Sequence, residues 1–301
     1  MSDAPPRPTF SPIGIGSESR APFVRLPSPA ALFARRAARF AAGAQGELAP
    51  YMGFLAGIAG AQAASVGPVP PIPDDEAGRA AGHGMPPIDR TRLKHDPAVL
   101  VTVHRFLDAC GSIAMPDGAV AALAALRADP ERLAARIADA VEDAVPMEHV
   151  AEYVFAAAGV QVHLACLAAA LPVALLQSVG DGVCPCCGGP PVASIVVERG
   201  GAHGARFCVC AACAVEWNVV RVKCALCGST EGIAYQQIEG SADGIQAETC
   251  DACGLYAKIM AQNEHPALDP VADDVASLAL DLKLAETEWK RGTVNAFLAG
   301  Y

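Results

Sequence analysis

The feature that most constrains this chain is a duplicated set of paired cysteines in its last third. Within each half of the set, 22 residues separate two CxxC pairs, and every cysteine of the first half recurs 40 residues later. The segment is therefore an internal repeat of one small unit with a period of 40 residues. The four pairs are Cys184/Cys187, Cys210/Cys213, Cys224/Cys227 and Cys250/Cys253.

The spacing within each pair is typical of metal ligands. Two intervening residues let both thiolates of a tight turn face one ion, and two such turns complete a tetrahedron. Glycine follows the second cysteine in three of the four pairs, where it permits the positive φ of the turn. We therefore predict two metal ions, Fe or Zn, each in a four-cysteine site. Such a site is closed by protein ligands, which indicates a structural or one-electron role.

Four cysteines and two histidines remain outside this set. Cys186 and Cys208 would break the 40-residue register as ligands, so they are predicted to be bystanders. Cys110 and Cys166 lie on apolar helix faces and are expected to be buried small hydrophobic residues. His163 is expected in the core or on a helix surface, and His203 in a loop.

The region before the cysteines is predicted to be all-α, with almost no strand signal between residues 24 and 178. Proline and glycine are dense between Val66 and Ile88, which predicts a long loop. The apolar stretch Val154–Leu176 is interrupted by polar residues and proline, which indicates a buried helix and no membrane insertion. Helices are expected at Pro29–Ala42, Tyr51–Ser65, about 96–110, after Asp129-Pro130, and from Pro146.

The first of these helices has an apolar and a basic face. Its apolar side chains are expected to face the core, whereas Arg35, Arg36 and Arg39 are expected to form a solvated face. The predicted core residues are Leu32, Phe33, Ala37 and Phe40.

After Gly182 the chain changes to short strand-like segments. Strands are predicted at Ser194–Val197, Glu216–Val222 and Ile233–Ile238. Helical spacing returns beyond Pro270, with Val271, Val275, Leu278 and Leu282 on one face, and the end of the chain is expected to be an uncapped tail. The predicted fold is thus an all-α N-terminal domain, two tandem rubredoxin-like or zinc-ribbon modules and a C-terminal helix. The expected boundaries are 1–22 for a flexible arm, 23–180, 181–222, 223–262, and 263–301.

The net charge and the motifs of the chain narrow the classes of function that it can have. The chain has a formal net charge of -10, and residues 184–262 hold five Lys/Arg against seven Asp/Glu, which disfavours a nucleic-acid partner. The first residues lack the pattern of a signal peptide, so a cytoplasmic protein with reduced thiols is expected. The sequence has no P-loop, nucleophile elbow or H-E-x-x-H motif, and we do not expect an enzyme.

Three motifs together resemble the family of the bacterial formate dehydrogenase accessory protein, FdhE. They are Cys184-Pro185-x-Cys187-Gly188, the run from Glu216 to Cys224, and Asp273-Asp274-x-Ala276-Ser277-Leu278. Residues 22–40, 51–62 and 84–89 are similar to the family's N-terminal helical region. The resemblance implies a cytoplasmic, non-catalytic assembly factor that binds the catalytic subunit of formate dehydrogenase. It also implies paired rubredoxin-type or zinc-ribbon knuckles, with which iron is associated in the family.

Two alternatives to an assembly factor stay open. A rubredoxin-like iron protein could transfer single electrons or protect a redox-sensitive partner. A zinc-ribbon regulator of nucleic acid is disfavoured by the acidic charge of the cysteine segment.

Overall fold

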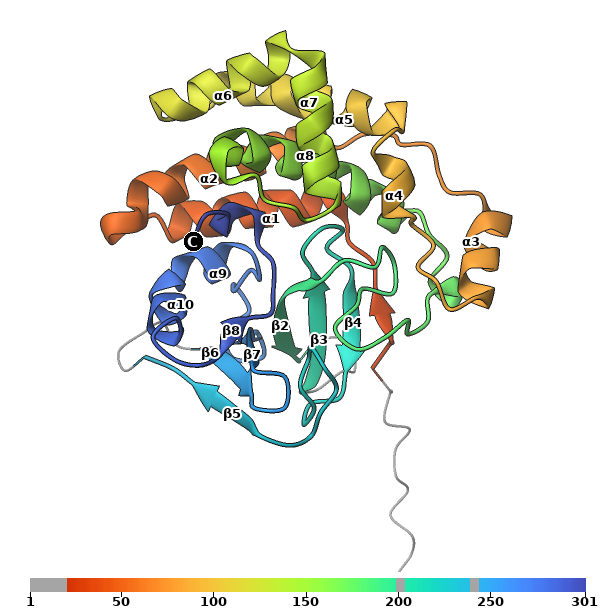
Figure 1. The fold of residues 1–301 in the computed structure, drawn as a ribbon, viewed down its shortest axis with the longest axis vertical. Coiled ribbons are helices and arrows are strands. Elements are labelled where there is room, and N and C mark those ends of the chain that lie inside the picture. The colour runs from red at the N-terminus through yellow and green to blue at the C-terminus, as the bar shows by residue number, and fades with distance from the viewer. Residues whose placement is uncertain (1–20, 199–203, 239–243) are drawn as a thin grey trace, which may run out of the picture.

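The structure, a computed structural model, describes residues 21–198, 204–238 and 244–301. Figure 1 shows most helices of the N-terminal half stacked above the strands, whereas the helix at residues 74–82 lies to the right of the strands. The C-terminal helices α9 (Ala272–Ala276) and α10 (Leu278–Leu284) lie beside the strands and below α1 (Pro29–Ala42) and α2 (Ala49–Ser65). Residues 1–20 of the predicted arm and His203 lie outside the described residues.

The helical region contains the five predicted helices and three more, α3, α4 and α6. Proline at the first turn begins α1, α5 and α7, and the side chains of Asp96 and Asp129 accept hydrogen bonds from the first free backbone amides of α5 and α7. The helices are α1 (Pro29–Ala42), α2 (Ala49–Ser65), α3 (Asp74–Gly82), α4 (Arg90–Leu93), α5 (Pro97–Ala109), α6 (Asp117–Ala128), α7 (Pro130–Val141) and α8 (Val150–Ala169).

The predicted long loop between Val66 and Ile88 is wrong in its middle, where α3 lies. Asp74, Asp75 and Glu76 occupy its first turn, where negative charge is favourable beside the free amides of a helix. The short helix buries Ala77 against the core. The surrounding prolines and glycines give the segment the composition of a loop, so composition alone does not predict this short helix. The sequence prediction also omitted α6, whose alanine-rich pattern has a weak apolar face.

Helix α8 is the core of the helical layer, as predicted for the apolar stretch. Among the described residues, one segment, Met147–Ala169, is long and apolar enough to cross a membrane, but 89% of its most apolar window is buried inside the protein. His163 lies fully buried on this helix, and its Nδ1 is 3.0 Å from Thr102 Oγ1. Burial lowers the pKa of His163 to about 4, so the imidazole is neutral at pH 7. His163 is therefore a core residue.

The expectation of a solvated basic face on α1 is wrong for two of its three arginines. Arg36 is only 3% exposed and pairs with Asp269, at 3.3 Å. Arg39 donates two hydrogen bonds to Asp273 through Nε and one through Nη2. The basic face of α1 therefore binds the start of the C-terminal segment, which contains these two aspartates.

Both cysteine repeats belong to one sheet of eight strands. Its order is β1-β4-β3-β2-β7-β6-β5, with β8 beside β7. The repeat is visible in the strands, because the bounds of β3 recur 40 residues later as those of β6. The strands are β1 (Val24–Arg25), β2 (Pro191–Val197), β3 (Ala205–Cys210), β4 (Glu216–Val219), β5 (Ile233–Gln236), β6 (Ile245–Cys250), β7 (Leu255–Ala261) and β8 (Lys290–Arg291).

Each repeat contributes three antiparallel strands, and the two repeats join where β2 runs parallel to β7. The register pairs Ser194 with Ile259 and Ile195 with Met260. At one edge of the sheet, β1 pairs with β4. The helical region therefore contributes one two-residue strand, in line with the prediction that it has almost no strand. The two metal-binding modules are tandem in sequence, and their strands form a continuous sheet.

Three of the six ribbon strands, β3, β6 and β7, were not predicted, because each carries a charged residue that interrupts the apolar pattern. These residues, Arg206, Glu248 and Lys258, are nevertheless buried. Arg206 from the first repeat donates to Glu248 Oε2 of the second at 2.6 Å, and Glu248 Oε1 accepts from the backbone N–H of Ala225 at 3.1 Å. The charges are thus compensated across the junction between the repeats.

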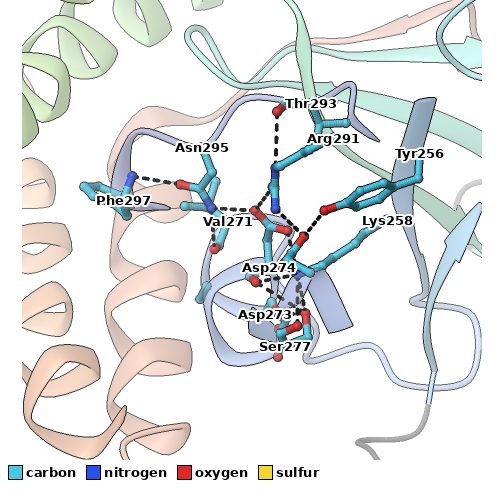
Figure 2. Close-up of polar contacts among 12 residues, drawn as sticks. Tyr256, Lys258, Val271, Asp273, Asp274, Ser277, Arg291, Thr293, Asn295 and Phe297 are labelled. Atoms are coloured by element: carbon cyan, nitrogen blue, oxygen red, sulfur yellow. Dashed lines mark hydrogen bonds and ion pairs between the residues drawn. The ribbon is translucent and has the colours of Figure 1, made fainter. Parts of the chain in front are cut away.

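Lys258 anchors the C-terminal segment to β7 (Figure 2). Its Nζ lies 2.5 Å from Asp281 Oδ2 and 3.1 Å from Asp274 Oδ1. Arg291 also contacts both carboxylates. A buried lysine and a partly buried arginine therefore share two buried carboxylates, which leaves these four charges neutral overall. Asn295 joins it by donating to Asp274 Oδ2 at 2.8 Å.

The predicted C-terminal helix and uncapped tail are only partly correct. Ser277 separates α9 from α10, so the expected single face is broken and Leu282 is 57% exposed. Asn295 caps a final 3₁₀ turn by accepting from the N–H of Phe297, which is fully buried. The Phe297 ring packs edge-on against Phe40, with centroids 6.0 Å apart. The tail is therefore part of the core.

We expect Glu248→Gln to lower the free energy of unfolding by about 3 kcal/mol, because it leaves the buried Arg206 charge uncompensated. The matched variant Glu288→Gln changes an exposed carboxylate in the same domain and should alter stability by less than about 0.5 kcal/mol. Urea unfolding of both variants measures the difference. Equal stability of the two variants would show that the Arg206–Glu248 pair does not hold the repeats together.

Candidate metal centres

The first candidate centre contains Cys184, Cys187, Cys210 and Cys213. Their sulfur atoms all lie within 4.8 Å of one another. The Sγ atoms of Cys184 and Cys213 are 3.6 Å apart, and those of Cys187 and Cys210 are 3.5 Å apart. A tetrahedron with metal–sulfur bonds of about 2.3 Å has edges of about 3.8 Å, so the sulfurs are spaced for one ion.

The second candidate centre has the same composition and contains Cys224, Cys227, Cys250 and Cys253. Its sulfurs also lie within 4.8 Å of one another, and those of Cys227 and Cys250 are 3.8 Å apart. The structure therefore brings the eight cysteines of the repeat into the two expected groups of four. Neither group includes Cys186 or Cys208.

The backbone conformation around the cysteines is the same in the two repeats, as is the spacing of the cysteines in the sequence. In the first turn of each repeat, the N–H of Gly188 or Gly228 donates to the carbonyl of Cys184 or Cys224. The N–H two residues after the first cysteine points at its sulfur, at 3.4 Å from Cys186 to Cys184 and at 3.4 Å from Leu226 to Cys224. Such N–H groups stabilise thiolates, so the turns suit a bound cation.

The residue directly after the second cysteine of each turn shows why glycine recurs in the sequence. Gly188, Gly228 and Gly254 have φ values of 72°, 72° and 69°. The remaining turn has Ala214 there, with φ 59°. Left-handed backbone costs a residue with a Cβ roughly 1–2 kcal/mol. The second turn of the first centre is therefore strained at Ala214.

We expect Ala214→Gly to stabilise the protein by about 1 kcal/mol, because relief of the strain at positive φ exceeds the added entropy of the unfolded chain. The reciprocal variant Gly254→Ala, at the corresponding position of the second repeat, should destabilise it. Thermal unfolding of both variants measures the effect. A lower melting temperature for Ala214→Gly would contradict the strain.

A largely buried guanidinium lies beside the first centre. Arg90, the first residue of α4, donates to Asp143 Oδ2 at 2.7 Å. A Cβ added at Gly189 would lie 2.9 Å from Arg90 Nη1, and 3.5 and 3.6 Å from the sulfurs of Cys187 and Cys210. Although burial alone would lower the pKa of Arg90, the Asp143 carboxylate and the two sulfurs raise it, so the positive charge is retained. It can balance the negative charge of four thiolates around one divalent ion.

Burial also changes the pKa values of the cysteine thiols in the first centre. It raises the pKa of Cys184 and of Cys213 well above the usual value. Burial acts the same way on Cys210, but hydrogen bonds with Cys184, Cys187 and Cys213 outweigh it and lower the pKa of Cys210. The ligands of a metal must be deprotonated, so an ion that binds here releases protons. Affinity at the first centre is therefore expected to fall as the pH falls.

We expect Arg90→Met to weaken metal binding at the first centre by about tenfold, because it removes the balancing charge beside the thiolates. Arg92→Met is the matched control. Arg92 lies on the same short helix, two residues after Arg90, and forms an exposed ion pair with Glu76. Competition with a chromogenic chelator measures the affinity. Equal affinities in the two variants would show that Arg90 does not act on the metal.

The remaining thiols behave as the sequence predicted. Cys110, Cys166, Cys186 and Cys208 are all buried outside the two groups. Burial raises the pKa of Cys110 and of Cys208 to about 12, so both thiols are protonated and unreactive at pH 7. Sequence analysis did not identify Arg90 or Glu248 as neighbours of the centres. Both act through tertiary contacts that no local motif signals.

Comparison with known proteins agrees with this architecture. Three family models match in order: FdhE N-terminal over residues 21–181, FdhE central domain over 183–221 and FdhE C-terminal domain over 222–298. A Protein FdhE homolog from Rhizobium meliloti is 46% identical over 308 residues and is covered completely, as is this chain. A Protein FdhE homolog from Stutzerimonas stutzeri is 35% identical, with 93% of each chain covered.

A solved structure has the same fold. The crystal structure of the FdhE protein from Pseudomonas aeruginosa matches with a TM-score of 0.83 and 30% identity, over 93% of this chain and 99% of that one. The fold and the sites define a class of protein in which a helical domain packs against two tandem four-cysteine ribbons. The chain belongs to the FdhE family.

Proposed function

We propose that this protein is a cytoplasmic assembly factor for formate dehydrogenase, which binds the catalytic subunit during maturation and catalyses no reaction itself. Membership of the FdhE family over the whole chain is the observation that carries this proposal. The family is associated with formate dehydrogenase maturation. The two groups of four cysteines support a metal-dependent version of that role, with one Fe or Zn ion in each.

The architecture suits binding better than catalysis. Four thiolates fill a tetrahedral site, which leaves no position for water or substrate. When bound, the ions would cross-link turns that have little apolar core of their own. Cys184 and Cys213 then belong to one rigid unit, although they are 29 positions apart in the sequence. A rigid surface of this kind can present fixed contacts to a partner protein.

A one-electron iron protein is the second candidate, and the N–H groups directed at the sulfurs favour it. Hydrogen bonds such as that from Ala212 to Cys210 Sγ, at 3.4 Å, tune the reduction potential of iron–thiolate centres. The iron-loaded protein would then show a reversible one-electron step. Its absence in protein that holds two irons would exclude this candidate and leave the assembly role intact.

A deletion strain complemented with plasmid-borne variants tests the assembly role. We expect deletion to abolish formate dehydrogenase activity and the wild-type chain to restore it. Cys187→Ser should fail to restore activity, because it removes a ligand of the first centre. Cys166→Ala should restore it, because this thiol lies outside both centres.

Affinity purification from the same anaerobic cells should recover the catalytic subunit with the wild-type chain. Western blots of each strain establish that the variant is present at the wild-type level, so loss of activity is not confused with loss of protein. Full formate dehydrogenase activity in the deletion strain would contradict the proposal.

A further inference from the structure

The two centres arise from one repeat but differ in exposure. All four cysteines of the first centre are buried. In the second, Cys227 is exposed and Cys253 is partly exposed. The residues between the ligands differ in the same way, because Ala211 and Ala212 are buried whereas their counterparts Asp251 and Ala252 are exposed. Identical ligand spacing has therefore produced one enclosed site and one site at the surface.

The helical domain encloses the first centre. The backbone N–H of Ile88 donates to the carbonyl of Cys186 at 3.0 Å, which holds the first turn. The side chain of Gln161 on α8 donates to the carbonyl of Ala211 at 3.0 Å, which holds the second. Arg90 adds a positive charge beside the sulfurs. Contacts with the helical domain therefore hold both turns of this centre.

The second centre is less enclosed, and the charged groups beside it are negative, whereas Arg90 beside the first centre is positive. Trp289 Nε1 contacts Asp251 Oδ1 at 3.2 Å across an exposed surface. The carboxylate of Asp181 packs against the other turn, since a Cβ added at Gly228 would lie 2.3 Å from its Oδ2. A carboxylate beside four thiolates disfavours their negative charge, whereas Arg90 favours it at the first centre. The neighbouring negative charge and the exposure therefore both weaken the hold of the second centre on an ion relative to the first centre.

We propose that the second centre is the exchange site of this protein, at which a thiolate from outside the chain displaces Cys227 from the bound ion, while the first centre is a fixed structural site. This inference rests on the proposed binding of one ion in each centre. Cys227 is the ligand involved because it is the exposed one. The other three ligands of the centre stay in place at this step.

The exchange needs no redox partner. The incoming sulfur forms a bond to the ion, the bond to Cys227 Sγ breaks, and the freed Cys227 thiolate takes a proton from water. The oxidation state of the ion does not change. Thiolates are the expected entering ligands, because the softness that suits the ion to four cysteines suits it equally to a fifth sulfur donor. Thiolate exchange of this type is faster at an accessible sulfur.

Zinc release from the full-length protein, loaded with two equivalents, tests the inference. We expect excess dithiothreitol with a chromogenic zinc indicator to release one ion at least about ten times faster than the other. Alkylation with N-ethylmaleimide during the fast phase, followed by peptide mapping, should mark Cys227 first and leave Cys184, Cys187, Cys210 and Cys213 unmarked. This mapping needs no mutation, so it does not depend on whether a variant folds.

The pair Cys227→Ser and Cys187→Ser provides the matched control, because the two residues occupy the same position of the repeat. Cys227→Ser should alter only the fast phase, and Cys187→Ser only the slow one. Release of two ions at one rate, or first alkylation within the first centre, would overturn the inference and leave the assembly role untouched. A wild-type protein that holds fewer than two ions would refute the metal-dependent proposal together with this inference.

Discussion

The architecture depends on the close approach of four cysteine sulfurs at each of two points. Sulfurs within 4.8 Å of one another are held by tight turns whose backbone N–H groups point toward them. As thiolates, four such groups repel one another, and only a cation makes the arrangement favourable. The small three-stranded units around them are therefore organised by their centres. Their shared sheet then allows one repeat to support the other, through β2 and β7.

Buried and partly buried ion pairs connect the parts of the molecule at three places. Arg206 and Glu248 join the two repeats, and the same glutamate also accepts from the Ala225 N–H in a turn of the second centre. Lys258 joins β7 to α9 and α10, as Figure 2 shows. Arg39 joins α1 to Asp273 at the start of α9. Buried pairs add little net stability but are costly to break, so they favour one arrangement of the parts.

Sequence analysis could predict the cysteine frame because its information is local and periodic. Spacing of two residues defines each turn, and the 40-residue period defines which turns belong together. It failed where tertiary contacts reverse a local preference. Arg36 has the charge of a surface residue but is buried against Asp269. Charged residues also interrupt β3, β6 and β7, but Arg206 and Glu248 pair with each other, and Lys258 pairs with carboxylates of α9 and α10. Arg90 could not be identified, because nothing around it in sequence indicates that it will meet two sulfurs.

The helical domain encloses one centre, and the other centre lies at the surface. X-ray absorption spectroscopy of the purified protein, combined with metal analysis, tests the central claim most directly. The account predicts two ions per chain, each surrounded by four sulfurs at about 2.3 Å. Fewer than two ions per chain, or a mixed shell with nitrogen or oxygen ligands at either site, would contradict it.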